Sequence, residues 1–185
     1  MPRVIYLGRN VKEYEEKSEE MIEQYLEDKE IICGKCLKPM RKHSKYPRMI
    51  KDLQEELMIT MVWCRKCKKW EALLPDFLMP YKHYSGNEIE SVIIDSKDTE
   101  VIDIETEASE LTVKRWINEL YAKIIGAIAF LKHLFRVNEI ESEPKHCYDE
   151  LEDVLEKATK NKKYSGNKLG LANIWLMANS APFYI

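Results

Sequence analysis

Two pairs of closely spaced cysteines constrain this chain more than any other feature: Cys33 with Cys36, and Cys64 with Cys67. A C-x-x-C turn lets two thiolates converge on one metal ion, and two such turns complete the tetrahedral four-sulfur shell that zinc prefers. A disulfide framework is the alternative, but the first residues do not read as a secretory signal, and Cys147 would remain unpaired. The spacing therefore predicts a structural Zn²⁺ site, because four thiolates leave no open position for water.

The segment around these cysteines, residues 31–84, has the composition of a zinc ribbon. Residues 57–63 are rich in strand formers and run into the second pair, and residues 70–74 are a candidate return strand. The segment holds 12 basic and 5 acidic side chains, although the net charge of the whole chain is −3. A local basic block attracts polyanions, because salt screens distant charge. We expect phosphate contacts from Lys35, Arg65, Lys66, Lys68 and Lys69.

A helix-turn-helix is predicted directly after the ribbon. Ser85 and Glu88 form a capping box for a helix over residues 86–96, and a short helix is expected over about 98–105. A third helix then begins near residue 109, with Val113, Trp116 and Ile117 facing inward. The side chains expected to meet DNA are Ser109, Thr112, Lys114 and Arg115.

This interpretation competes with a simpler one, in which residues 109–117 are only the first turns of an amphipathic core helix. Residues 85–110 carry 1 basic and 9 acidic side chains, and carboxylates repel phosphate. DNA binding therefore requires that the acidic side chains lie on the face away from the DNA.

A family resemblance rests on the two cysteine pairs, the run Leu-Pro-Asp-Phe-Leu-Met-Pro-Tyr-Lys-His-Tyr-Ser at residues 74–85, and Thr-Val-Lys-Arg-Trp at residues 112–116. Over about residues 30–120 the chain resembles an uncharacterised bacterial family with a domain-of-unknown-function label. That family is similar to the DNA-binding front ends of insertion-element transposases. The resemblance implies a zinc ribbon coupled to a helix-turn-helix, and no established activity.

The rest of the chain is predicted to be helical, which gives an α+β fold that is mainly helical. A strand at the N-terminus precedes a helix over about 11–28, with Asn10 and Glu13 as its capping box. An apolar stripe over residues 111–137 suits either core packing or a two-stranded coiled coil, and hence a homodimer. Beyond a linker near 138–146, helices are expected over about 148–160 and 169–178. The division is 1–30 for the strand and helix, 31–84 for the ribbon, 85–137 for the helix-turn-helix with its long helix, and 138–185 for the C-terminal helices.

Function classes other than binding find little support in the sequence. No apolar run reaches the roughly 18 residues of a membrane span, and the six glycines form no phosphate loop. Too little chain remains after the ribbon for a transposase catalytic domain, and the adjacent His146 and Cys147 rarely form a catalytic pair at that spacing. We expect a non-enzymatic, cytoplasmic protein that binds double-stranded DNA. The sequence pI of about 5.9 keeps a zinc-stabilised adaptor for other proteins open as the alternative.

Overall fold

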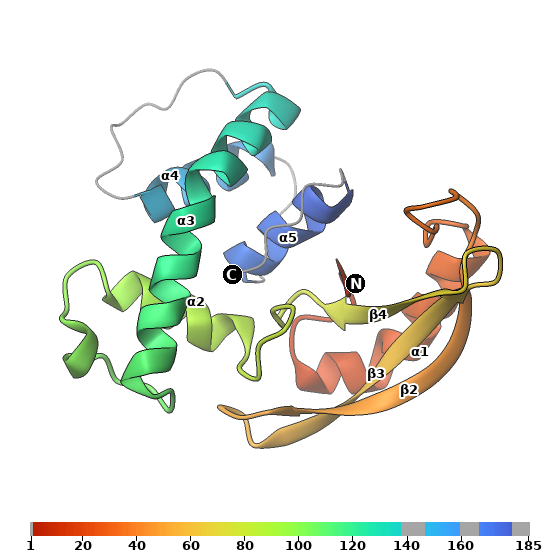
Figure 1. Ribbon diagram of the computed structural model, residues 1–185, viewed down its shortest axis with the longest axis horizontal. Helices are drawn as coiled ribbons and strands as arrows, with labels where there is room; N and C mark the ends of the chain where they lie inside the picture. Colours follow the sequence, from red (N-terminus) through yellow and green to blue (C-terminus); the bar gives the residue numbers. More distant parts are fainter. Residues whose placement is uncertain (1, 138–146, 160–166, 179–185) are drawn as a thin grey trace.

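The computed structural model describes residues 2–137, 147–159 and 167–178, and within these ranges it is a mixed α+β fold. The expected linker at 138–146 and the expected helix start at Tyr164 lie outside the described residues. Figure 1 shows the sheet and the first helix on one side of the molecule and the later helices grouped on the other. In the described ranges, no helix combines the length and apolar character that crossing a bilayer requires.

Four strands form one sheet in the order β1-β4-β3-β2. The short β1 pairs with β4 in parallel, whereas β2, β3 and β4 are antiparallel. The strands are β1 (Arg3–Ile5), β2 (Arg41–Ile50), β3 (Glu55–Cys64) and β4 (Lys69–Pro75). The strands expected at the N-terminus, at 57–63 and at 70–74 are therefore present, but the sequence did not predict β2.

Helix α1 (Val11–Glu27) covers one face of this sheet. It begins at Asn10, whose Oδ1 accepts a hydrogen bond from the backbone N–H of Glu13 at 2.9 Å, as the capping box predicted. Tyr14 is buried, and its hydroxyl donates to the carbonyl of Met58 in β3 at 2.9 Å. Lys42 of β2 forms an ion pair with Glu19 of α1, so the helix also contacts the edge strand β2, which is rich in cations.

The remaining helices are α2 (Gly86–Asp95), α3 (Glu110–Phe135), α4 (Cys147–Ala158) and α5 (Lys168–Ala178). Each lies within a few residues of its predicted position. The short helix expected at 98–105 is only a 3₁₀ turn at Val101–Asp103. Residues 96–109 thus join α2 to α3, which is longer than the three- or four-residue turn of a helix-turn-helix. That arrangement is not confirmed.

The apolar side chains form two clusters that divide the chain near residue 78. Buried residues from Val4 to Leu78 make the first cluster, and those from Met79 to Leu176 make the second. The stripe of α3, including Trp116 and Leu120, is buried in the second cluster, which is the core-packing alternative. The guanidinium of Arg48 joins the two halves by donating to the carbonyl of Met79 at 2.7 Å.

Candidate metal centre and the adjoining basic groove

The four paired cysteines come together at one end of the sheet. One ligand atom from each of Cys33, Cys36, Cys64 and Cys67 lies within 4.8 Å of all the others, and the sulfurs of Cys36 and Cys64 are 3.5 Å apart. A tetrahedral shell with metal–sulfur bonds of about 2.3 Å would place its sulfurs about 3.8 Å apart. The cluster therefore fits one metal ion without a large rearrangement.

Both cysteine pairs sit on turns of the same backbone shape, which we call the knuckles (residues 33–37 and 64–68). In the first, the N–H of Leu37 donates to the carbonyl of Cys33 at 2.8 Å, and in the second, Lys68 donates to Cys64 at 2.8 Å. Leu37 and Lys68 have φ values of 55° and 56°, a conformation uncommon outside glycine. The fold thus holds two strained, matching turns that direct four sulfurs to one point.

The cysteine pKa values depart from the ordinary value in opposite directions. Burial raises the pKa of the Cys33 thiol, but hydrogen bonds from the backbone N–H groups of Lys35 and Cys36 outweigh it and bring the pKa to about 7. Hydrogen bonding with the Cys36 sulfur, followed by burial, raises the pKa of Cys67 to about 12. Four adjacent thiols cannot all ionise without a cation between them, so metal binding must release protons.

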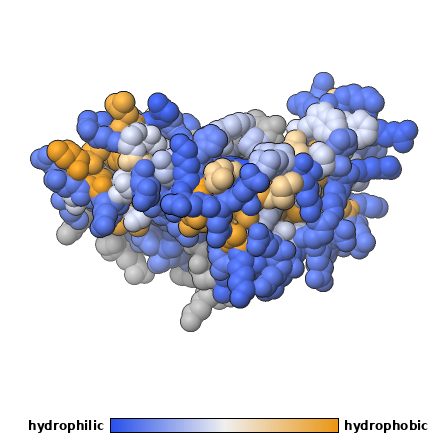
Figure 2. Space-filling model, turned by 90° about the horizontal axis from the view of Figure 1, so that it is seen from below, coloured by the Kyte–Doolittle hydropathy of each residue, from blue (hydrophilic) through white to orange (hydrophobic). Residues whose placement is uncertain are grey.

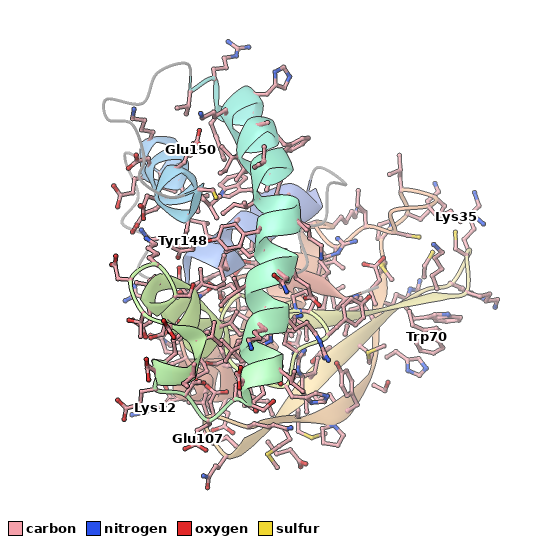
Figure 3. All side chains as sticks on the ribbon, turned by 60° about the vertical axis from the view of Figure 1, so that its left-hand side comes forward. Lys12, Lys35, Trp70, Glu107, Tyr148 and Glu150 are labelled. Carbon is pink, nitrogen blue, oxygen red and sulfur yellow. The ribbon has the colours of Figure 1, made fainter. Side chains whose placement is uncertain are left out.

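An aromatic cluster lies beside the second knuckle and consists of His43, Trp63 and Trp70. The two indole rings are stacked with centroids 5.7 Å apart, and the imidazole ring meets Trp70 edge-on at 4.1 Å. The ammonium group of Lys68 lies 5.1 Å from the centre of the Trp63 ring. Figure 3 shows Trp70 at the same end of the molecule as Lys35 of the first knuckle.

Two hollows that share three lining residues lie between this cluster and α3. The first, about 860 Å³, runs over β2–β4 and is lined by Tyr46, Trp70 and Leu74 among others. The second, about 550 Å³, reaches the N-terminal half of α3. The two hollows share residues 81–83 and are the two parts of what we call the basic groove. Its charged and histidine side chains are Arg48, Lys51, Lys82, His83, Arg115, Glu119 and Lys123, of which only Glu119 is acidic among the described lining residues.

The residues expected to contact DNA are distributed unequally around this groove. Thr112 and Arg115 line it, whereas Lys114 pairs with Glu110 and does not. Ser109 precedes α3 as expected, but its hydroxyl lies 2.9 Å from that of Thr112 and caps no backbone N–H. The ribbon cations are all exposed around the knuckles: Lys35, Arg65, Lys66, Lys68 and Lys69.

The predicted DNA contacts left out four cations of the groove, namely Arg48, Lys51, Lys82 and Lys123. The spacing of Arg115, Glu119 and Lys123 is i, i+4, i+8, which places them on one side of a helix and could have identified Lys123. Lys82 and Lys51 had no comparable signal, because the pairing of their loops with α3 depends on the tertiary fold.

The acidic side chains of the 85–110 segment lie away from the groove. Glu88, Glu105 and Glu107 line a separate hollow of about 810 Å³ beside the start of α1, and none of them lines the basic groove. Figure 3 shows Glu107 near Lys12, at the opposite end of the molecule from Trp70. No acidic side chain of residues 85–110 is among the groove's lining residues, although Glu107 borders it: the hydroxyl of Tyr84, which lines the groove, donates to the Glu107 carbonyl at 3.5 Å.

Comparisons with known proteins point to a family that has no assigned activity. No curated protein and no solved structure matches the chain. The segment from Cys33 to Trp116, which spans the four cysteines and most of the basic groove, matches the model of a protein family described as "Domain of unknown function (DUF6431)" (residues 33–116).

Proposed function

We propose that this chain is a zinc-stabilised DNA-binding protein of the mobile-element type that the sequence resembles. The four-cysteine cluster holds Zn²⁺, which suits an all-sulfur site. The ion is structural: it fixes the two knuckles and so positions the cations and rings beside them. The chain needs no catalytic group for this activity.

The observation that carries the proposal is the gathering of cations along the basic groove, whose two parts share residues 81–83. Lys51, Lys82, Arg115 and Lys123 come from separate parts of the chain, yet they line one concave surface. Lys82 pairs with Glu119, the one acidic side chain among the described lining residues. The lining residues of the groove therefore carry more positive than negative charges. Clustered cations in a concave site attract a polyanion more strongly than the same charges spread over a surface.

Within this proposal, the ribbon and α3 have different roles. Ammonium groups on flexible knuckle side chains are suited to phosphates, which position the protein on DNA but carry no sequence information. Arg115 can pair with the edge of a guanine through its fork of donors. We place the groove contacts on the N-terminal half of α3, in the manner of a recognition helix with an unusually long connection before it.

A protein-interaction adaptor is the second candidate, and exposed apolar side chains on α3 favour it. Leu111 is 75% exposed and Ile125 is 72% exposed, on the side of the helix that the second cluster does not use. Figure 2 shows hydrophobic residues at the end of the molecule opposite the knuckles. The homodimer expected through 111–137 would have to use this side, because the apolar stripe is buried.

Salt-dependent binding to a DNA duplex tests the proposal against the adaptor. The double variant Arg115→Ala/Lys123→Ala should weaken binding and flatten the salt dependence by about one unit of slope per lost phosphate contact. The control is Arg9→Ala/Lys12→Ala, which removes the same two residue types beside the acidic hollow and should leave binding unchanged. Absence of duplex binding at low salt, or equal loss in both variants, would contradict DNA binding through the groove.

A further inference from the structure

The face of the sheet opposite α1 carries the aromatic cluster in register. Arg41, Trp63 and Trp70 are direct neighbours across β2, β3 and β4. Side chains alternate between faces along a strand, so Met61 and Ala72, two residues away on β3 and β4, belong to the next row on that face. Ser44 completes this row; it is three residues from Arg41 because the pairing of β2 is irregular between Lys42 and Ser44. Lys42 and Lys45, which pair with Glu19 of α1, lie on the other face. The ring-bearing face is therefore the one that α1 leaves uncovered.

The rings on this face are accessible. Trp70 is 43% exposed, although a large aromatic on a sheet usually gains more by complete burial. Its indole is held in place by the stacked Trp63 and by the edge of His43, so little side-chain freedom is left to lose when a ligand binds. From Trp70 the basic groove continues past Tyr46 to Tyr81.

Cations border these rings on several sides. The Lys68 ammonium group lies over Trp63, and Arg41 neighbours Trp63 on β2. Further along the groove, Lys82 and His83 form part of the wall. A row of flat apolar rings edged by positive charge complements a chain that alternates flat bases with negative phosphates, and it suits an uncharged or basic peptide poorly.

We propose that this aromatic face binds an unpaired stretch of nucleic acid, with bases stacked on Trp70 and in the groove beyond it, and with phosphates against Lys68 and Arg41. The inference rests on the proposed function and makes it more specific. In a duplex, each base face is covered by its neighbours and cannot reach an indole ring. Stacking on protein aromatics therefore selects unpaired nucleotides, with little dependence on sequence.

The experiment compares unpaired and paired ligands with the full-length, zinc-loaded protein. The probes are fluorescently labelled 12-nucleotide oligothymidylate, the matching oligouridylate, and a duplex of the same length. Trp70→Ala should weaken oligothymidylate binding about tenfold, within the range measured for loss of one stacked base, and should change duplex affinity less than twofold. The oligouridylate separates the two sources of this chemistry: equal affinity means that the sugar is not read.

Two further variants keep the result interpretable. Trp70→Phe preserves a stacking ring and should retain most of the affinity for the unpaired probe. Ile125→Ala removes an apolar side chain of α3 that is even more exposed (72%, against 43% for Trp70), and it should leave the affinity for the unpaired probe unchanged. Zinc content and circular dichroism of each variant report whether the ribbon is folded.

The possible failures are distinguishable. If the protein binds duplex but Trp70→Ala binds oligothymidylate as tightly as the parent, the aromatic face is not a stacking site and the proposed function stands. Equal loss of duplex and oligothymidylate binding also overturns the inference, because Trp70 would then act without selecting unpaired bases. If neither ligand binds, the proposed function fails together with it.

Discussion

At the scale of single residues, the five cysteines divide into two kinds according to their surroundings. Cys33 and Cys64 are fully buried and belong to the first apolar cluster, so the metal site is part of that core. Cys147 is the first residue of α4 and lies outside the sulfur cluster. Burial of a thiolate needs a compensating cation, so we expect the core around the knuckles to depend on a bound metal ion.

We therefore predict that Cys64→Ser lowers the zinc content from one ion per chain to nearly none, whereas Cys147→Ser keeps the full amount. The first variant should also lose strand signal, because Cys64 ends β3 and, without a bound metal ion, its side chain no longer ties this end of β3 and β4 to the first knuckle. Metal analysis and circular dichroism of the purified proteins provide the measurements. A Cys64→Ser protein that retains stoichiometric zinc would rule out the four-sulfur site.

Glu90 of α2 is the residue that joins the later helices. Its carboxylate accepts hydrogen bonds from the hydroxyl of Tyr148 in α4, from the side-chain amide of Asn167, and from the N–H of Lys168 at 3.1 Å. Asn167 in turn accepts from the N–H of Gly170 at 2.7 Å, which caps α5. Burial is the largest influence on Glu90 and raises the pKa of its carboxyl group above the ordinary value.

A raised pKa in the folded protein means that folding favours the protonated form of Glu90. Its contribution to stability is then fully present below the ordinary pKa of about 4.3 and is lost as the pH rises through the raised value. Glu90→Gln cannot titrate, so the free energy of unfolding of the variant relative to the parent should increase from pH 4 to pH 8. Denaturant unfolding across this range measures the trend. A difference that stays flat from pH 4 to pH 8 would contradict the prediction.

At the scale of elements, the sequence predicted the helices better than the sheet. The caps at Asn10 and Ser85 are local signals, and the structure forms both, with Glu88 donating its N–H to the Ser85 hydroxyl at 3.1 Å. Strand β2 was missed because its sequence is dominated by cations and has no apolar alternation. It is an edge strand: β3 pairs it on one side, and Lys42 and Lys45 are compensated by Glu19 of α1. That compensation is tertiary and cannot be read from a local pattern.

In the candidate site too, features that depend on local sequence were predicted, and features that depend on the tertiary fold were not. The spacing of the cysteines predicted the sulfur cluster, because a C-x-x-C turn brings its ligands together locally. The basic groove could not be predicted, since it joins the loop at residues 81–83 to α3 through packing in the second cluster. Arg115 was recognised from helix periodicity, but its neighbours Lys51 and Lys82 were not.

Helix α5 meets the turn after β4 at a position where only glycine fits. A Cβ atom at Gly170 would collide with the backbone carbonyl of Asp76, whereas one at Gly126 in α3 would meet nothing within 4 Å. The same substitution should therefore have opposite effects. Gly170→Ala is expected to destabilise the protein by about 1–3 kcal/mol through overpacking, and Gly126→Ala to stabilise it by about 0.5–1 kcal/mol through helix propensity. Urea unfolding of both variants tests this; equal shifts would show that α5 does not pack closely on the turn.

At the scale of the whole molecule, each apolar cluster comes mainly from one half of the chain, whereas the basic groove is lined by residues of both halves. The two apolar clusters follow the chain, with Cys33 and Cys64 of the four-sulfur cluster in the first and the buried Trp116 and Tyr148 in the second. The basic groove, in contrast, takes its walls from both halves, because Tyr46 and Arg115 lie on opposite sides of the shared residues 81–83. The proposed DNA binding through the groove therefore requires that both clusters be folded and docked, although the four paired cysteines belong to the first cluster alone.

This arrangement predicts what removal of zinc does to the chain. Without the ion, the buried thiols of the first cluster lose the cation that compensates them, and the ends of β3 and β4 at the second knuckle lose their closure. The second cluster has its own buried aromatic and aliphatic side chains and the Glu90 hydrogen bonds, none of which involves the metal.

Chelation should accordingly abolish hydrogen-exchange protection in β3 and β4, leave protected amides in the Leu120–Leu131 part of α3, and eliminate duplex binding. Added zinc should restore protection and binding together, while added magnesium should restore neither, because thiolates are poor ligands for it. Equal loss of protection in α3 and in the sheet would show instead that the two clusters unfold as one cooperative unit and that the metal stabilises the whole molecule.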